Sequence, residues 1–335
     1  MKTTPPDPNL TVWFQGQYVR LGDANVNILT HALNYGTAVF EGVRGYYSET
    51  EDQLYLNRLE DHYKRWLQNC GILRIGVEST AAQLCEITAE LCRRNRFRSS
   101  VYVRPLAYKA SARIGVHSDD NDAAAITVVP LGEYFKEDQG LRAGVVSWRR
   151  VDDNAIPGRA KISGAYANSV LAGDEARANG YDEAIFLNQD GHVAEAAAAN
   201  IFIIRRGTLI TPAVTDNVLE GITRESVMEL ARRELGLSAI ERSVDRSELY
   251  IAEEVFLCGT AVEVAPVVAV DHRQLGDGKP GKITRQLRQL YADAVRGRLP
   301  AYRHWLWPAY EKSEPKSEPM SEPMQREDKK DAVRV

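Results

Sequence analysis

Residues 160–202 read AKISGAYANSVLAGDEARANGYDEAIFLNQDGHVAEAAAANIF. The first part predicts a helix over 163–180, because a serine stands at its start and a glycine just past its end. The second part predicts β-strands, since the polar sequence NQDG separates two apolar runs as a turn would. Two ionisable side chains stand out: Lys161 comes just before the helix, and Glu195 comes directly before four alanines. The stretch therefore predicts mixed α and β structure that carries a lysine and a carboxylate.

The composition indicates a globular protein with two domains. The chain has 335 residues, of which 44% are hydrophobic and 26% charged, enough for a sizeable core. A net charge of −4 gives no basic field, which argues against nucleic acid or an anionic membrane as the main partner and favours small molecules. No apolar run approaches the roughly 18 residues of a membrane span, and the start MKTTPPDPNLTVWF does not resemble a signal peptide. The four cysteines lack metal-ligand spacing, so we expect reduced thiols, no metal site and a cytoplasmic location.

The N-terminal part, residues 1–133, predicts a small α+β domain. Helices are expected over 57–71 and 79–95, where apolar residues recur at helical spacing. In the first of these helices, Asn57 and Glu60 are spaced as a capping box. The runs SVYVRPLAY and AAAITVVP then predict strands.

A second, larger domain is predicted over 141–311. The polar sequence LGEYFKEDQG precedes it, and we place an interdomain loop at 134–140. Further helices are expected over 221–236 and 283–297, with strands between them. The tail 312–335 repeats Ser-Glu-Pro and has almost no apolar content, which predicts disorder, either as a linker remnant or as a regulatory segment.

Lys161 is the first candidate for chemistry. It follows a Pro-Gly turn and lies among small residues, where a side chain can project into a cleft. By spacing alone, a solvated surface lysine is the commoner outcome. The chain contains no GxGxxG, Walker A, GxSxG or HExxH motif, so the usual nucleotide, serine-nucleophile and zinc sites offer no competing interpretation. Lysine-based chemistry therefore stays open.

Several motifs extend this picture to a family. Besides residues 160–202, the chain contains HALNYGTAVFEGVRGY, YVRPLAY, LEGITRESV and IAEEVFLCGTAVEVAPV. In this order, from about Trp13 to Tyr310, they resemble the branched-chain amino acid aminotransferases, class IV enzymes of pyridoxal-phosphate fold type IV. The resemblance implies a two-domain α+β or α/β fold like that of D-amino acid aminotransferase, with a small N-terminal α/β domain and a larger C-terminal pseudo-barrel domain.

The same resemblance implies pyridoxal 5'-phosphate as the cofactor and assigns three residues to its ring. Lys161 matches the lysine that binds the cofactor covalently and moves the proton of the substrate. Glu195 matches the acid that holds a proton on the ring nitrogen, without which the ring is a poor electron sink. Tyr166 matches the donor to the phenolic oxygen.

Four elements are expected to hold the phosphate and the ring face. Arg65 matches the family's phosphate arginine, although periodicity alone would leave it an ordinary solvated side chain. The backbone amides of Ile222 and Thr223 open a helix, a position that favours anions independently of the resemblance. Thr260 supplies a hydroxyl to the phosphate, and Leu219 packs on the ring. Without the motif, the helix start would be an ordinary cap, Thr260 a turn residue and Leu219 a core leucine.

The resemblance also places the substrate. Tyr102 and the turn at Thr260 and Ala261 are expected to hold the α-carboxylate, and Arg104 acts with two tyrosines on the second carboxylate of glutamate. An apolar side-chain pocket is expected from Tyr35, Phe40, Gly42 and Tyr134, with Val116 approaching from a partner subunit.

The implied reaction is a ping-pong transfer of the amino group of L-leucine, L-isoleucine or L-valine to 2-oxoglutarate. Because the pocket is completed across subunits, a homodimer is the minimal unit, and a hexamer is common in the family. The same fold carries D-amino acid and (R)-amine transaminases and aminodeoxychorismate lyase, so an altered donor range or a carbon–oxygen lyase is the alternative. A non-enzymatic vitamin B6-binding protein would lack the lysine or the acid, and both are present.

The four alanines are where the chain departs from this family. Branched-chain members typically read Glu-Gly-x-x-Glu-Asn here, so Ala196 replaces a glycine and Ala199 replaces a second glutamate expected near Tyr166 and Arg44. Alanine at 196 predicts a backbone φ below zero or modest strain. Without the second acid, we expect Arg44 to be solvated or free to meet an anionic substrate group.

Overall fold

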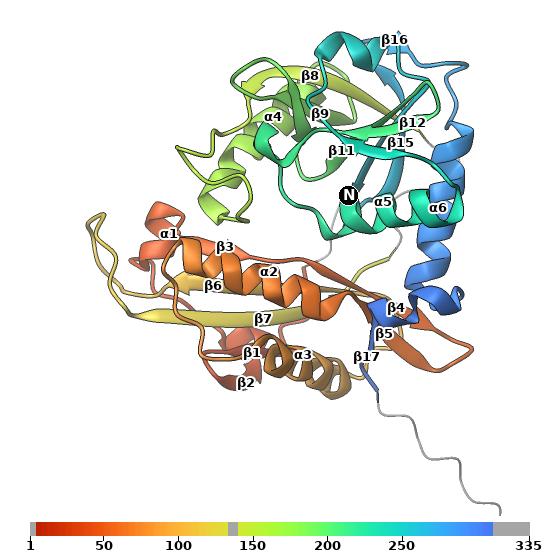
Figure 1. Ribbon diagram of the computed structural model, residues 1–335. Coiled ribbons are helices and arrows are strands. Elements are labelled where there is room, and N and C mark those ends of the chain that lie inside the picture. The colour runs from red at the N-terminus through yellow and green to blue at the C-terminus, as the bar shows by residue number, and fades with distance from the viewer. Residues whose placement is uncertain (1–4, 133–139, 311–335) are drawn as a thin grey trace, which may run out of the picture.

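The computed structural model describes residues 5–132 and 140–310, and two β-sheets organise them (Figure 1). The first sheet has the order β17-β5-β4-β6-β7-β1-β2, with β3 paired to β6. Its strands are β1 (Thr11–Phe14), β2 (Gln17–Arg20), β3 (Ala38–Phe40), β4 (Val43–Ser48), β5 (Gln53–Asn57), β6 (Val101–Lys109), β7 (Asp122–Pro130) and β17 (Leu306–Pro308). Every pairing in this sheet is antiparallel.

The second sheet has the order β10-β9-β8-β15-β14-β11-β12-β13, with β16 paired to β15. Its strands are β8 (Leu141–Arg149), β9 (Glu183–Leu187), β10 (Val193–Ala196), β11 (Asn200–Arg205), β12 (Thr208–Thr211), β13 (Ala239–Glu241), β14 (Glu254–Gly259), β15 (Glu263–Val270) and β16 (Arg273–Gln274). The pairs β8–β9, β8–β15 and β12–β13 are parallel, so this sheet is mixed.

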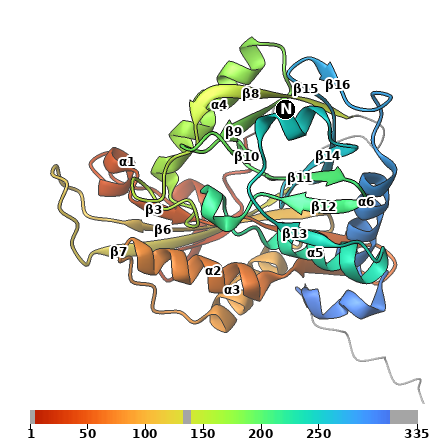
Figure 2. The ribbon, with the colours of Figure 1, turned by 45° about the horizontal axis from the view of Figure 1, so that its top comes forward.

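Two helices cover one face of the first sheet. They are α2 (Leu59–Ile72) and α3 (Ala81–Asn95), which lie side by side in Figure 2 and bury Trp66 and Leu84 against the strands. The expected capping box at Asn57 and Glu60 is wrong. Asn57 is the last residue of β5, and its side-chain amide donates to the hydroxyl of Tyr291 instead. The helix begins after Arg58, which has no side-chain cap.

The C-terminal strand β17 returns to the first sheet. It pairs with β5, opposite Leu56 and Tyr55, although the sequence places residues 141–311 in the second domain. The three residues carry no periodic signal that would have predicted this return. The end of the described chain therefore ties the two halves together.

The second sheet must curl on itself. β10 and β11 are five strand spacings apart in the sheet order, about 24 Å in a flat sheet. Only residues 197–199 connect them, and the amide of Ala196 donates to the carbonyl of Ala199 at 2.8 Å. A tight turn across this distance is possible only if the sheet closes toward a barrel. This geometry agrees with the expected pseudo-barrel.

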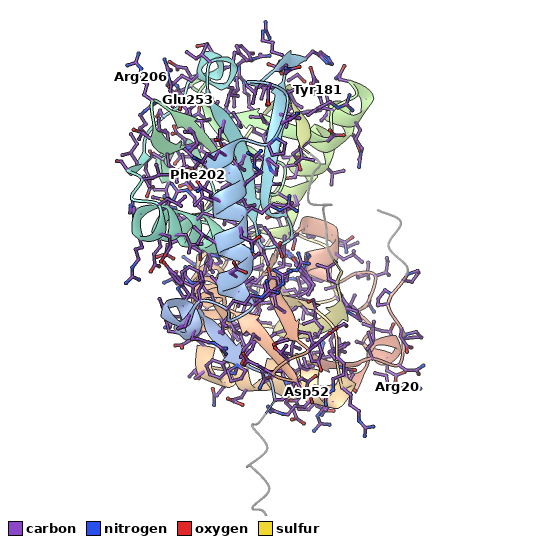
Figure 3. All side chains as sticks on the ribbon, turned by 90° about the vertical axis from the view of Figure 1, so that its right-hand side faces the viewer. Arg20, Asp52, Tyr181, Phe202, Arg206 and Glu253 are labelled. Carbon is purple, nitrogen blue, oxygen red and sulfur yellow. The ribbon has the colours of Figure 1, made fainter. Side chains whose placement is uncertain are left out.

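Three longer helices pack on the second sheet. α4 (Tyr166–Ala178) lies against β8 and β9, after a 3-10 turn at Ser163–Ala165. α5 (Ile222–Glu234) and α6 (Lys282–Val295) share a core with Phe202, which lies beside α6 in Figure 3. A short helix, α1 (His31–Tyr35), precedes β3 in the first half. Among the described residues, no helix combines the length and apolarity required to cross a membrane.

Candidate active site

A cavity of about 560 Å³ lies between the two halves of the molecule. The first half contributes Gly42 and residues of β3, β6 and α2. The second half contributes Arg150 and residues from the segments 161–166, 195–200, 219–223 and 258–261. Lining residues that the sequence predicted are Phe40, Gly42, Arg65, Tyr102, Arg104, Lys161, Tyr166, Glu195, Leu219, Ile222, Thr223, Thr260 and Ala261. The fold thus gathers most of the predicted site from widely separated motifs.

Lys161 forms contacts with both halves of the molecule, through its backbone with the first half and through its side chain with the second. The amide of Phe40 donates to the Lys161 carbonyl at 3.1 Å, and Val39 forms a bridge with Ile162. The Lys161 Nζ donates to the Tyr166 hydroxyl at 2.9 Å. Burial alone would lower the pKa of Lys161, but Tyr166 and Glu41 outweigh it and raise the pKa. At neutral pH the Lys161 side chain is therefore a cation inside the cavity.

Glu195 is fixed at the end of β10 by three donors. Its Oε1 lies 2.9 Å from Nη2 of Arg150, and its Oε2 accepts hydrogen bonds from the Asn200 amide and the Leu219 backbone N–H, both at 3.1 Å. Glu195 and Arg150 are both buried. Sequence reasoning missed Arg150, because it follows β8 and reaches Glu195 only through the pairing of β8, β9 and β10.

The alanine turn forms a wall of the cavity. Ala197, Ala198 and Ala199 all line it, so this wall carries no charged or hydrogen-bonding side chain between Glu195 and Asn200. Ala196 continues β10 opposite Ile185, with φ outside the left-handed region. The expectation that φ lies below zero at Ala196 is therefore confirmed, and alanine fits there without strain.

The start of α5 offers an anion site. Gly221 is the N-cap, and Ile222 and Thr223 follow it at the cavity wall, where their N–H groups lack partners within the helix. A Cβ on Gly221 would lie 2.0 Å from the side-chain oxygen of Asn200, so only glycine permits this approach. Arg65 reaches the same place, since its Nη1 donates to the Glu220 carbonyl at 2.7 Å.

Tyr102 and Arg104, both on β6, form another part of the cavity wall. Nη2 of Arg104 donates to the Tyr102 hydroxyl at 3.0 Å, and its guanidinium carbon lies 4.5 Å from the centre of the Phe40 ring. The Phe40 ring in turn packs edge-on against Tyr166, with centroids 4.7 Å apart. Gly42 makes room for this wall, because a Cβ there would lie 2.1 Å from the Tyr102 hydroxyl oxygen.

Three predicted substrate residues do not line the cavity, and a fourth lies outside the described residues. Tyr35 is exposed, and its hydroxyl accepts a hydrogen bond from the Gly115 amide. Val116 lies on the surface with 76% of its area exposed. Tyr134 falls within 133–139, which the structure does not describe.

Arg44 is the third predicted substrate residue that does not line the cavity. The expectation that it is solvated or free to meet an anionic substrate group is wrong. It is only 3% exposed and forms an ion pair with Glu263, 3.2 Å away. Its Nη1 donates to the Ala261 carbonyl and its Nη2 to the Gly132 carbonyl. Glu263 therefore provides the carboxylate that position 199 lacks. Arg44 supports the turn that carries Ala261 through its hydrogen bond to the Ala261 carbonyl.

The donors of this cavity suit one kind of bound group. One cavity brings together a lysine amine, a buried carboxylate and a helix N-terminus with an arginine. Three donors fix the orientation of the Glu195 carboxylate, which can accept a hydrogen bond from a protonated heterocyclic nitrogen, while the α5 end suits a phosphate. These residues fit an aldehyde-bearing pyridine ring with a phosphate arm.

Known proteins agree with this geometry. The family model for class IV amino-transferases matches residues 38–270. The probable branched-chain-amino-acid aminotransferase of Aquifex aeolicus is 46% identical over 301 residues, which cover 90% of this chain and 97% of that protein.

Solved structures give the same result. The branched-chain aminotransferase of Thermoproteus uzoniensis with norvaline has a TM-score of 0.85 at 43% identity, covering 90% of this chain and 99% of that one. The branched-chain amino acid aminotransferase of Thermobaculum terrenum in its PLP form has a TM-score of 0.87 at 41% identity, covering 91% and 100%.

This chain belongs to the class IV aminotransferase family. Its predicted family, fold type, transferase class and pyridoxal-phosphate cofactor are thereby confirmed.

Proposed function

We propose that the chain transfers the amino group of L-leucine, L-isoleucine or L-valine to 2-oxoglutarate in two half-reactions. The observation that carries this proposal is the meeting of Lys161, Tyr166 and Glu195 in one cavity opposite the start of α5. The relatives' branched-chain names support this donor class over the D-amino acid, amine and lyase alternatives.

Pyridoxal 5'-phosphate, when bound, supplies a carbon that accepts the amino group and a ring that withdraws electrons from the substrate Cα. Lys161 would hold it covalently, Glu195 its ring nitrogen, Tyr166 its phenolic oxygen and Leu219 its face. The phosphate would be held by the Ile222 and Thr223 amides, with Arg65 and the Thr260 hydroxyl.

Lys161 is also the base in this proposal. Its Nζ would take the proton from the substrate Cα and pass it to the cofactor carbon that accepts the amino group, and it would move a proton in the opposite direction in the second half-reaction. The Tyr166 hydroxyl, 2.9 Å from Nζ, keeps the amine in place. Glu195, fixed by Arg150 and Asn200, would hold a proton on the ring nitrogen.

The substrate would lie between Tyr102 and the alanine turn. The Tyr102 hydroxyl and the turn at Thr260 and Ala261 would hold the α-carboxylate. Phe40 and the methyl groups of the alanine turn offer an apolar surface to an aliphatic side chain. Arg104, which is exposed beside Tyr102, offers a cation to the second carboxylate of 2-oxoglutarate.

A homodimer completes this proposal, and larger assemblies remain compatible with it. An exposed apolar patch formed by the segments 26–33 and 114–116 lies next to Tyr35; its members are Val26, Ile28, Leu29, Leu33, Ile114 and Val116. Ile28 and Ile114 are 76% and 81% exposed, which is unusual for isoleucine on a monomer surface. We further propose a cytoplasmic location, which suits four free and buried cysteines.

A donor panel tests the function. Purified full-length chain with 2-oxoglutarate should form glutamate rapidly from L-leucine, L-isoleucine and L-valine, and slowly from D-alanine or (R)-1-phenylethylamine. The Lys161→Ala variant serves as the matched blank. Efficient turnover of D-alanine without L-leucine would refute the proposed donor class.

A further inference from the structure

A buried carboxylate lies directly behind the cavity. Glu41 has no exposed surface and does not line the cavity, yet it follows Phe40, which does. Its Oε2 lies 2.5 Å from Nδ1 of His62 and accepts a weaker hydrogen bond from the Gly42 amide at 3.3 Å. A fully buried acid is expensive unless its partners are fixed, so its surroundings need explanation.

The main partner of Glu41 is Arg65. Nε donates to Oε1 at 3.1 Å, and Nη2 donates to both carboxylate oxygens, at 2.6 and 2.9 Å. The Nη1 group points elsewhere and donates to the Glu220 carbonyl, one residue before the N-cap of α5. Three of the five N–H groups of this guanidinium are thus used on one side, and the Nη1 edge is the part that remains for a ligand.

Burial would raise the pKa of Glu41, but Arg65 and His62 outweigh it and lower the pKa to about 2. Burial lowers the pKa of His62 despite the nearby acid. At neutral pH, a neutral His62 therefore donates to an anionic Glu41, and the pair Glu41–Arg65 carries no net charge. Arg65 is therefore not an isolated cation that attracts phosphate from a distance.

We propose that Glu41 is a positioning residue for the cofactor phosphate: it fixes the guanidinium of Arg65 so that the Nη1 edge faces the start of α5. This inference rests on the proposed function, because it assumes that the α5 end of the cavity holds the phosphate. Arg65 lies on α2 and α5 lies on the other half of the molecule, so the fixed guanidinium also sets how the two halves meet at the phosphate.

Charge and position predict opposite results for Glu41→Gln. If Glu41 acted only through its charge, removing it would leave Arg65 a stronger cation and tighten phosphate binding. If Glu41 acts by position, the amide has one acceptor oxygen where the carboxylate has two, and its NH2 group would face Nη2, which now donates to both oxygens. The guanidinium then turns, and phosphate binding weakens. Pyridoxal, which lacks the phosphate, is the control ligand, because its attachment to Lys161 uses none of these contacts.

The experiment measures dissociation constants of the full-length chain, freed of cofactor, for pyridoxal 5'-phosphate and for pyridoxal from the visible absorption band. In Glu41→Gln we expect the ratio of the two constants to shift by about 10- to 100-fold against the phosphate, the range of one misplaced charge-assisted hydrogen bond. Glu41→Asp keeps the charge but shortens the reach, and it should shift the ratio in the same direction, which also provides a second variant if Glu41→Gln does not fold.

The matched control is Asp122→Asn. It converts an acid to an amide in another buried ion pair of the first sheet, with Lys109 at 2.9 Å, outside the cavity. We expect it to lower stability and leave the ratio unchanged. A ratio in Glu41→Gln that is unchanged or shifted toward the phosphate would overturn the inference while the proposed function stands. A wild-type chain that binds neither compound would overturn both.

Discussion

Gly42→Ala is the most direct test of how the first half shapes the substrate wall. A Cβ at this position would lie 2.1 Å from the Tyr102 hydroxyl oxygen and 2.8 Å from its Cζ. An ordinary contact begins at 3.4 Å, so the tyrosine ring must move by about 1.3 Å. The hydrogen bond from Arg104 to this hydroxyl, now 3.0 Å, cannot survive that shift in place.

The expected loss is larger in catalysis than in stability. A misplacement of about 1 Å in a substrate-positioning group costs about 100-fold in rate, whereas overpacking costs about 1–3 kcal/mol of folding free energy. Steady-state kinetics with L-leucine and 2-oxoglutarate should therefore show kcat/KM reduced about 100-fold, and urea unfolding should show a modest loss. The control is Gly71→Ala, where a Cβ meets nothing within 4 Å. Equal kcat/KM in the wild type and both variants would refute this account of Tyr102.

Three further predictions follow from neighbouring contacts. Gly221→Ala forces the Asn200 oxygen away from a Cβ at 2.0 Å and should weaken cofactor binding by about 1–3 kcal/mol in an absorption titration; undiminished binding would contradict it. Ala199→Glu adds a carboxylate to the cavity that repels the side-chain carboxylate of glutamate, so kcat/KM for glutamate should fall about tenfold relative to kcat/KM for leucine. An unchanged ratio would contradict this prediction. The depressed pKa values of Glu41 and His62 contribute stability that is lost as pH falls, below about 6.5 for His62 and from about 4.5 to about 2 for Glu41. The stability gap between wild type and Glu41→Gln in urea should accordingly narrow on going from about pH 5 to about pH 3, and a gap that widens would contradict the ion pair.

Local signals explain what the sequence could predict. Gly180 has the left-handed φ of 77° expected after a helix, and the turn at Arg206 and Gly207 has positive φ at both residues, as a two-residue hairpin requires. Lys161 precedes the helical turn and Tyr166 begins α4 five residues later, so one motif places both. These features depend on neighbours along the chain, which a sequence displays.

Partners distant in the chain explain what it could not. Glu41 meets Arg65 from 24 residues away, and Arg150 meets Glu195 through three paired strands. Arg44 was expected to lack a carboxylate partner because residue 199 is alanine. Glu263, 219 positions downstream, forms the ion pair with its guanidinium instead. The sequence shows each of these residues as a charge and does not show which opposite charge the fold brings to it.

The absorption spectrum of the purified chain tests directly whether Lys161 holds the cofactor. We expect a visible band that disappears in Lys161→Ala and bleaches in the wild type when L-leucine is added without a 2-oxo acid. Addition of 2-oxoglutarate should then restore the band. A wild-type chain that stays colourless with added pyridoxal 5'-phosphate, or a Lys161→Ala variant with an unchanged band, would contradict it.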